Sequence, residues 1–316
     1  MIDTSYRQVW DRRSSDDLAA LEAVDNSGSE QVAQATGKRA AESVVQALSI
    51  RPGDTVLELG CGAARIGREL VGRCGQWIGV DISPNMIRVA QRRLSDHNNA
   101  RLHVLDRTSL EPIASDSVDK VYSIAVLCHM DKEDLFLYLR EVARVLKPGG
   151  LAYLETWNLA DPVGWERWMY EVEFWAQSDH SQRKDVARNQ FCVAEEFALY
   201  AERAGLDVLT CFRDSPWLQL VAGRDLDADT RAGHRLRVAE ARSEIAYTPL
   251  FGQLFLDCIR VIYGHLHPKQ AIKKLKALGD RPEVRLYLTH IEGLWEQDPD
   301  RYGPEPADAL TEPDVS

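Results

Sequence analysis

Basic residues are scarce in this 316-residue chain: 38 Lys and Arg stand against 49 Asp and Glu, for a formal net charge of −11. A surface that follows nucleic-acid phosphates needs an excess of Lys and Arg, so we expect no nucleic-acid partner. No apolar run approaches the length of a membrane helix, so we expect no membrane span. Residues 1–6 include neither a basic nor an apolar stretch, so no secretory signal is expected.

Cysteine is also scarce, and its spacing lacks the short pairs that are typical of metal sites. The six cysteines lie at positions 61, 74, 128, 192, 211 and 258. Most have apolar neighbours in the sequence, where cysteine behaves as a small hydrophobic residue. The sequence therefore predicts no metal site and a cytoplasmic location.

Strand and helix patterns alternate over residues 51–223, which predicts an α/β fold with a parallel sheet covered on both faces. The predicted strands are 55–59, 77–81, 102–105, 119–125, 151–156, 207–213 and 217–222. Only Asp214-Ser215-Pro216 joins the last two strands, and so short a connection implies an antiparallel hairpin.

Helical segments flank this predicted core on both sides. Residues 1–50 predict an N-terminal helical lid, and residues 224–297 predict a helical extension. Residues 157–190, rich in tryptophan, interrupt the core as an insertion. The tail at 298–316 is rich in Pro, Asp and Glu, and we expect it to be disordered.

A glycine-rich turn, Gly60-Cys61-Gly62, follows the first buried strand directly. A dinucleotide-binding turn has a third glycine where this chain has Arg65, so a pyrophosphate would fit poorly. A nucleoside cofactor without phosphate needs only the close backbone approach that the two glycines allow. Asp81 ends the next strand, where a carboxylate can accept hydrogen bonds from two ribose hydroxyls. Asp106 ends the following strand and could bind an adenine amino group.

In this order, these motifs resemble those of class I S-adenosylmethionine (SAM) dependent methyltransferases. The matching segments are Glu58-Leu59-Gly60-Cys61-Gly62, Val80-Asp81-Ile82-Ser83, Leu105-Asp106 and Leu146-Lys147-Pro148-Gly149-Gly150. The resemblance covers about residues 50–223 and implies a doubly wound, Rossmann-like sheet of seven strands with the last strand antiparallel. It implies SAM as cofactor and S-adenosylhomocysteine as product.

The resemblance also implies which residues bind the cofactor. They are Gly60, Cys61, Gly62 and Ile124 for the methionine part, Asp81 for the ribose, and Ile82, Met86, Asp106 and Arg107 for the adenine. Tyr6 and Trp10 share one helix face and resemble an N-terminal lid over the methionine end. The alternative is that these two rings only pack on the sheet domain.

His129 lies just beyond the fourth strand, near the expected position of the methyl group. It is our candidate general base for a hydroxyl acceptor, and the alternative is that it orients the cofactor or the loop. Segment 123–126 reads Ser-Ile-Ala-Val, which argues against adenine and glutamine amide targets. Other polar candidates, each expected to be solvated or capping, are Glu155, Asn158, Asp161, His180 and Asn189.

The acceptor is expected beside the tryptophan-rich insertion, at the carboxyl edge of the sheet. Trp165, Trp168, Val172 and Trp175 share one helix face there. That face either covers the acceptor or packs into the core, as aromatic stripes usually do. The apolar helices at 224–297 could cover the pocket or form a homodimer interface.

Together these features predict an enzyme that methylates a small molecule. We expect a hydroxyl acceptor, as in an O-methyltransferase of specialised metabolism or glycan modification. The alternatives are N- or C-methylation of a small amine, quinone or lipid-like acceptor, and a SAM-binding regulatory subunit without turnover. A dehydrogenase is a weaker alternative, which NAD binding would reveal.

Overall fold

One mixed sheet organises the chain in the computed structural model, which describes residues 4–177 and 189–303. The strand order is β3-β2-β1-β4-β5-β8-β7, with β6 paired to β5 off this path. The strands are β1 (Thr55–Leu59), β2 (Gln76–Asp81), β3 (Ala100–Val104), β4 (Val118–Ser123), β5 (Leu146–Asn158), β6 (Phe191–Cys192), β7 (Asp207–Phe212) and β8 (Trp217–Gly223). The order reverses between β1 and β4, which creates a crevice at their carboxyl ends.

The pairing confirms the predicted doubly wound sheet with an antiparallel last strand. Strands β1 to β5 run parallel to one another, whereas β8 is antiparallel to both β5 and β7. The short β6 adds a strand that the sequence did not predict; it pairs with β5 at Trp157 and Asn158.

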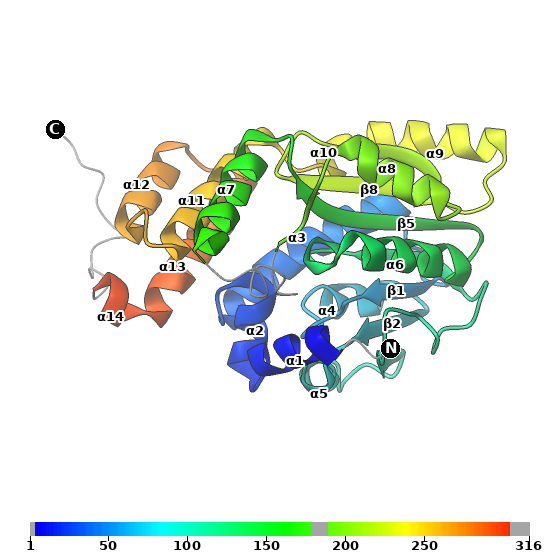
Figure 1. Cartoon of the computed structure of the whole chain (residues 1–316), viewed down its shortest axis with the longest axis horizontal. Coiled ribbons are helices and arrows are strands. Elements are labelled where there is room, and N and C mark those ends of the chain that lie inside the picture. Colours follow the sequence, from blue (N-terminus) through cyan, green and yellow to red (C-terminus); the bar gives the residue numbers. More distant parts are fainter. Residues whose placement is uncertain (1–3, 178–188, 304–316) are drawn as a thin grey trace.

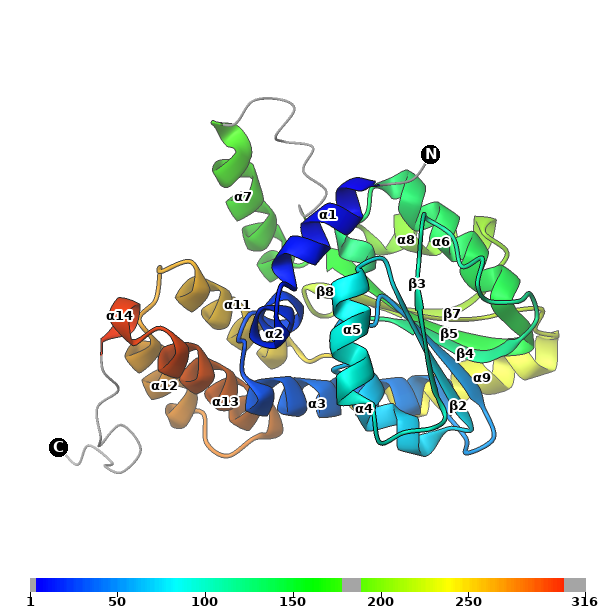
Figure 2. The ribbon, with the colours of Figure 1, turned by 90° about the horizontal axis from the view of Figure 1, so that it is seen from below.

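Helices cover both faces of this sheet and extend beyond one end of it (Figure 1). They are α1 (Thr4–Arg13), α2 (Asp17–Asp25), α3 (Glu30–Leu48), α4 (Gly67–Leu70), α5 (Pro84–Arg93), α6 (Lys132–Val145), α7 (Pro162–Ala176), α8 (Ala194–Arg203), α9 (Ala228–Glu240), α10 (Arg242–Ile245), α11 (Pro249–Ile262), α12 (Pro268–Ala277), α13 (Pro282–Gln297) and α14 (Pro299–Tyr302). Figure 2 shows α1, α2 and the C-terminal helices at the same end of the sheet.

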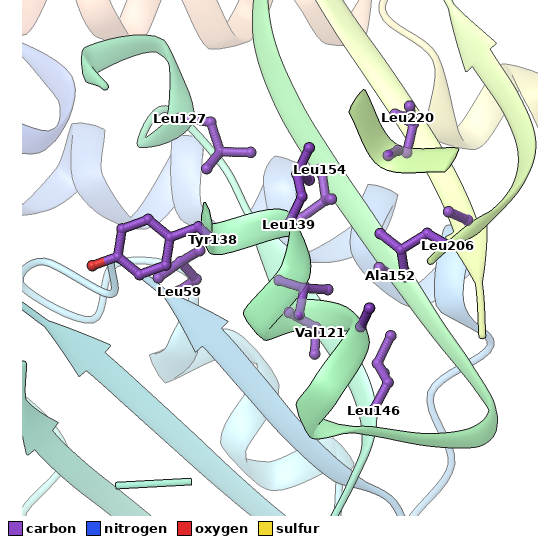
Figure 3. Packing of buried hydrophobic residues seen from close by; sticks show 14 of the residues in the cluster. Leu59, Val121, Leu127, Tyr138, Leu139, Leu146, Ala152, Leu154, Leu206 and Leu220 are labelled. Carbon is purple, nitrogen blue, oxygen red and sulfur yellow. The ribbon is translucent and has the colours of Figure 1, made fainter. Parts of the chain in front are cut away.

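Alternating side chains on the strands divide the core into two layers. Leu57 and Leu59 of β1 join the layer under α6 and α8, where Leu139, Leu154 and other residues are buried (Figure 3). Val56, between these two leucines, faces the other layer, under α3 and α9. The alternation of side chains along β1 therefore places both layers of the core directly before the glycine turn.

Two predicted elements differ from the structure near the motifs. The helix expected at 64–73 is only α4 followed by a 3-10 turn at Val71–Arg73. Ala64 has a left-handed φ of 55°, which an α-helix does not allow. Strand β5 starts at Leu146, before the expected 151: Val118 pairs with Leu146 and Lys120 with Leu151, so residues 147–150 form a bulge within the strand.

The C-terminal helices α11, α12 and α13 pack around an apolar cluster of their own. The segment Arg242–Ile262 meets a length and composition test for a membrane helix, although 56% of its window is buried in the protein and a buried core helix passes the same test. The prediction of disorder from residue 298 is wrong for 298–303: α14 forms there, and Tyr302 Oη donates to the carbonyl of Val261 (3.0 Å). Residues 304–316 lie outside the described residues.

Candidate functional site

A cavity of about 700 Å³ opens where the carboxyl ends of β1, β2, β4 and β5 meet the flanking helices. This volume is within the range of small-molecule and cofactor sites. The helices α1, α2, α3, α7, α11 and α13 supply much of the rest of its wall. Residues from distant parts of the chain therefore line one continuous space.

The glycine turn, Gly60-Cys61-Gly62, forms one side of the cavity. Gly60 and Gly62 have left-handed φ values of 73° and 50°. A Cβ at Gly60 would lie 2.4 Å from Val126 Cγ2, and one at Gly62 would lie 2.7 Å from Val24 Cγ1. Both positions therefore need glycine, for conformation as well as for space.

Asp81 fastens this turn to the end of β2. Its Oδ2 accepts a hydrogen bond from the Gly62 N–H (2.9 Å), and its Oδ1 accepts one from the Ser83 N–H (2.9 Å). Burial raises the pKa of Asp81 to about 6, against these hydrogen bonds, which lower it. Ile82 and Met86 line the cavity beside Asp81, so these predicted cofactor residues lie together.

Asp106 and Arg107 are not brought into this cavity, although their neighbours Leu105 and Thr108 line it. They line a separate hollow of about 280 Å³. Strand β3 ends at Val104, earlier than expected, and Arg7 of α1 binds Asp106 instead: its Nη2 donates to Asp106 Oδ1 (2.8 Å). A role for Asp106 and Arg107 in adenine binding stays a prediction.

Helix α1 lies against the cavity and presents Tyr6 and Trp10 to it. Tyr6 Oη accepts from the Asp131 N–H (3.1 Å) at the start of α6. At the start of α5, Asp11 Oδ1 accepts from Ser83 Oγ (2.5 Å). These contacts attach α1 to α5 and α6, and whether α1 acts as a lid stays a prediction.

His129 and Ile124 line the cavity after β4. His129 belongs to the 3-10 turn Leu127–His129, and its N–H donates to the Val126 carbonyl (2.9 Å). Its ring meets the Trp10 ring edge to face, with centroids 5.1 Å apart. The turn and Trp10 therefore hold this imidazole between α1 and the strand ends.

Two buried glutamates line the cavity at strand ends, and the sequence reasoning did not assign either to the site. Glu58 of β1 accepts from Tyr122 Oη (2.5 Å), and burial raises its pKa to about 8. Glu155 of β5 accepts from Tyr153 Oη (2.5 Å), and burial raises its pKa to about 7. The expectation that Glu155 is solvated is wrong, because β5 continues to Asn158 and keeps it inside the sheet.

The remaining polar candidates have structural partners. Asn158 Nδ2 donates to the carbonyls of Arg213 and Ser215 (both 3.0 Å). Asp161 caps α7, as the capping expectation had it. Asn189 lines the cavity, and its Oδ1 accepts from Trp157 Nε1 (3.1 Å). His180 lies outside the described residues.

Helix α7 does reach the cavity, but with a different face from the predicted one. Of the four predicted residues only Trp175 lines the cavity, and Trp165 is 51% exposed. The lining residues of α7 are Arg167, Tyr170, Glu171, Phe174 and Trp175. As a cover for the acceptor, the predicted face is wrong because α7 turns the buried Arg167–Glu171 ion pair inward. Trp168 packs against the buried cluster that contains Trp157, as the packing alternative had it.

Another part of the cavity wall is mainly aromatic. We call it the acceptor chamber; its lining includes Trp157, Trp217, Phe255, Tyr263 and Arg167. The Trp157 and Trp217 rings stack with centroids 4.0 Å apart. The cavity thus has a polar end built from backbone turns and an aromatic end built from side chains.

Known proteins match part of this chain, and the part that the family model matches includes the glycine turn. Residues 56–150 match a family model described as methyltransferase domain. Methyltransferase GfsG of Streptomyces halstedii is 32% identical over 36% of this chain and 41% of its own. The 2-methyl-6-phytyl-1,4-hydroquinone methyltransferase of Synechocystis sp. is 31% identical over 50% of this chain and 48% of its own. This chain therefore spans about half the length of these curated relatives.

A solved structure shares the fold more widely. It is a chain from the complex of the Haloferax volcanii Trm112 methyltransferase activator and a putative methyltransferase, and it covers 69% of this chain and 98% of its own. The TM-score is 0.51 at 20% identity. The sheet order defines a Rossmann-like fold. With the family match over residues 56–150, which include the glycine turn, the chain contains a methyltransferase domain, and its sheet order is that of the class I SAM-dependent type.

Proposed function

We propose that this protein transfers a methyl group from SAM to a hydroxyl oxygen of a small-molecule acceptor. One observation carries the proposal: the glycine turn with Asp81 and the acceptor chamber line the same cavity. A donor at the polar end would thus face an acceptor at the aromatic end. Relatives named as methyltransferases support the transfer of a methyl group.

The residues at the polar end fit SAM. Gly60 and Gly62 leave open backbone where any Cβ would collide, and Asp81 offers a carboxylate to the ribose hydroxyls. SAM, when bound, supplies a methyl group that its sulfonium already activates. The protein then has to align the acceptor and exclude water, which can contribute about 7–11 kcal/mol in well-oriented systems. Tyr6 and Trp10 would close the site on the lid side.

His129 is the proposed general base. It lines the same cavity as the glycine turn and the acceptor chamber, and Trp10 supports its ring. A ring nitrogen of His129 would take the proton from the acceptor hydroxyl as the oxygen attacks. Such a base contributes roughly 10²–10⁴-fold to the rate.

A quinol-type acceptor methylated on carbon is the second candidate. The relatives include a 2-methyl-6-phytyl-1,4-hydroquinone methyltransferase and a demethylmenaquinone methyltransferase, each matching about half of its length. The stacked rings of Trp157 and Trp217 would suit a flat aromatic acceptor. Regulatory SAM binding without turnover is the alternative outside catalysis.

Labelled SAM tests the proposal directly. Wild-type protein, incubated with methyl-labelled SAM and small molecules extracted from the source organism, should transfer label to a small molecule. Carbon NMR of a ¹³C-methyl product then separates a methoxy group from a ring methyl. His129→Asn should lower the rate by about 10²–10⁴-fold for a hydroxyl acceptor and leave S-adenosylhomocysteine binding unchanged.

The outcomes separate the candidates. Tight S-adenosylhomocysteine binding without label transfer would favour a regulatory subunit, and binding of NAD alone would indicate a dehydrogenase. A ring methyl in the product would replace hydroxyl methylation by the quinol candidate.

Two further expectations remain predictions. The cytoplasmic location needs fractionation of the source cells. A homodimer through α11–α13 is tested by the molar mass in solution. The test is needed because these helices already bury much of their apolar surface against one another.

A further inference from the structure

Arg167 is an unusual residue for the wall of an aromatic chamber. It is only 6% exposed, and its Nη2 pairs with Glu171 Oε1 at 2.8 Å. Its Nε and Nη1 are buried and have no hydrogen-bond partner among residues 4–177 and 189–303. A buried guanidinium donor without a hydrogen-bond partner is costly. We therefore expect a bound ligand to accept hydrogen bonds from these nitrogens.

The surroundings hold this guanidinium in place. The Arg167 Cζ lies 5.3 Å from the centroid of the Tyr263 ring and 6.0 Å from that of Trp157. Glu171 is itself fixed, since its oxygens accept from Trp175 Nε1 (3.0 Å) and Asn189 Nδ2 (2.7 Å). The open donors of Arg167 therefore belong to an ordered group that lines the cavity.

We propose that Arg167 binds a carboxylate of the acceptor, so that the substrate is an aromatic or apolar acid; this rests on the proposed methyl transfer to a small molecule. Arginine donates to a carboxylate through several N–H groups at once, and such charge-assisted bonds are stronger than neutral ones. Glu171 occupies only one nitrogen, so a second carboxylate can bind at the others. The rings of the acceptor chamber would pack on the apolar part of the acid.

Matched pairs of small aromatic probes test this inference on the full-length protein saturated with S-adenosylhomocysteine. The probes are 4-hydroxybenzoate with 4-hydroxybenzamide, and 3,4-dihydroxybenzoate with its amide; phenyl phosphate is added to compare a phosphate with the carboxylates. Dissociation constants come from calorimetry or ligand-observed NMR. We expect each carboxylate to bind at least about tenfold tighter than its amide, and tighter than phenyl phosphate.

Variants assign the preference to Arg167. Arg167→Gln should abolish it, and Arg203→Gln, on the exposed end of α8, should leave it intact. The double variant Arg167→Gln with Glu171→Gln avoids an unpaired buried carboxylate and should also lose the preference. Unchanged S-adenosylhomocysteine binding in each variant shows that the fold and the cofactor end are preserved.

The failures are distinguishable. If wild-type protein does not bind S-adenosylhomocysteine, the proposed function itself is overturned. If it does bind, this inference alone is overturned by equal affinity for acid and amide, by no binding of any probe, by stronger binding of phenyl phosphate, or by a preference that survives in Arg167→Gln.

Discussion

The two ends of the cavity are built in opposite ways. At the polar end, backbone groups and one carboxylate from β1 and β2 make the site, and the residues involved lie within about two dozen positions of each other. At the aromatic end, the side chains come from β5, α7, β8 and α11, which are separated by up to about a hundred positions. One end is a local motif, and the other exists only after folding.

This difference explains why the sequence reveals more about the polar end of the cavity than about the aromatic end. A turn that needs glycines in the left-handed conformation tolerates few residue types, so it can be recognised in the sequence. A wall of packed aromatic side chains tolerates many combinations, since apolar residues of similar volume replace one another at small cost. The donor is therefore easier to infer than the acceptor.

Gly62→Val should give the largest effect and only at the polar end. The new side chain meets Val24 and a φ of 50°, which a β-branched residue rarely adopts. We expect S-adenosylhomocysteine to bind at least about 100-fold more weakly by calorimetry, since such strain costs on the order of 1–3 kcal/mol before the clash is added. Gly72→Ala, with no atom within 4 Å of the added Cβ, is the control. Affinity within threefold of wild type would show that the turn does not contact the cofactor.

Asp81→Asn should have a smaller effect at the same end. The amide nitrogen cannot accept from the Gly62 or Ser83 N–H, so one of these backbone donors loses its partner. A lost bond to a buried donor costs about 1–3 kcal/mol, or roughly 5- to 150-fold in affinity for S-adenosylhomocysteine. Asp96→Asn, on the exposed surface, should change nothing. An unchanged affinity in Asp81→Asn would remove Asp81 from the ribose site.

Phe255→Ala sharpens the comparison from the aromatic end. Phe255 meets the Trp157 ring with centroids 5.5 Å apart and lines the cavity. Loss of an aromatic contact, about 0.5–1.5 kcal/mol, should raise the acceptor KM about 2- to 12-fold and leave the KM for SAM unchanged. Leu236→Ala, 62% exposed on α9, is the control. A raised KM for SAM alone would show that the two ends are not separate.

Much of the fold could be predicted from the sequence because its signals are local. The alternating strands and helices, the capping Ser83 before α5 and the short Asp214-Ser215-Pro216 connection each specify their own element. The shortened α4 could not be predicted in this way. Its loss depends on the left-handed Ala64, which follows from the turn geometry rather than from helix propensity.

The residues of the site also fall into those with a local sequence signal and those placed by tertiary contacts. Gly60, Gly62 and Asp81 lie in the cavity as the motifs predicted. Asp106 does not, because Arg7, about a hundred residues away, binds it. Arg167 was missed because its inward position depends on the pairing with Glu171 and on the packing of α7. The signal in the sequence that could have indicated Arg167 is a pair of charged residues between two tryptophans, in Trp165-Glu166-Arg167-Trp168.

The last prediction, where the smallest effect is expected, concerns the pH dependence of stability. Buried carboxyl groups at both ends of the cavity contribute to it. Burial raises the pKa of Glu58 to about 8 and of Asp81 to about 6 at the polar end, and of Glu155 to about 7 at the aromatic end. A raised pKa means that the folded protein keeps each proton at pH values where the unfolded chain has lost it. The contribution of these three acids to the stability of the unliganded protein is therefore fully present below about pH 4 and is lost as the pH rises to about 8.

Melting temperatures between pH 5.5 and 8.5 check this direction. We expect the melting temperature of wild-type protein to fall over this range, by on the order of 2–4 °C for each kcal/mol of stability lost. Glu58→Gln should flatten the upper part of the curve, near pH 8, and Glu155→Gln the part around pH 7, because each variant removes one titration. A melting temperature that rises over this range would contradict the assignment of protons to these carboxyls. If Glu58→Gln alone flattens the curve, the proton-dependent part of the stability belongs to the polar end, where the backbone motif also lies.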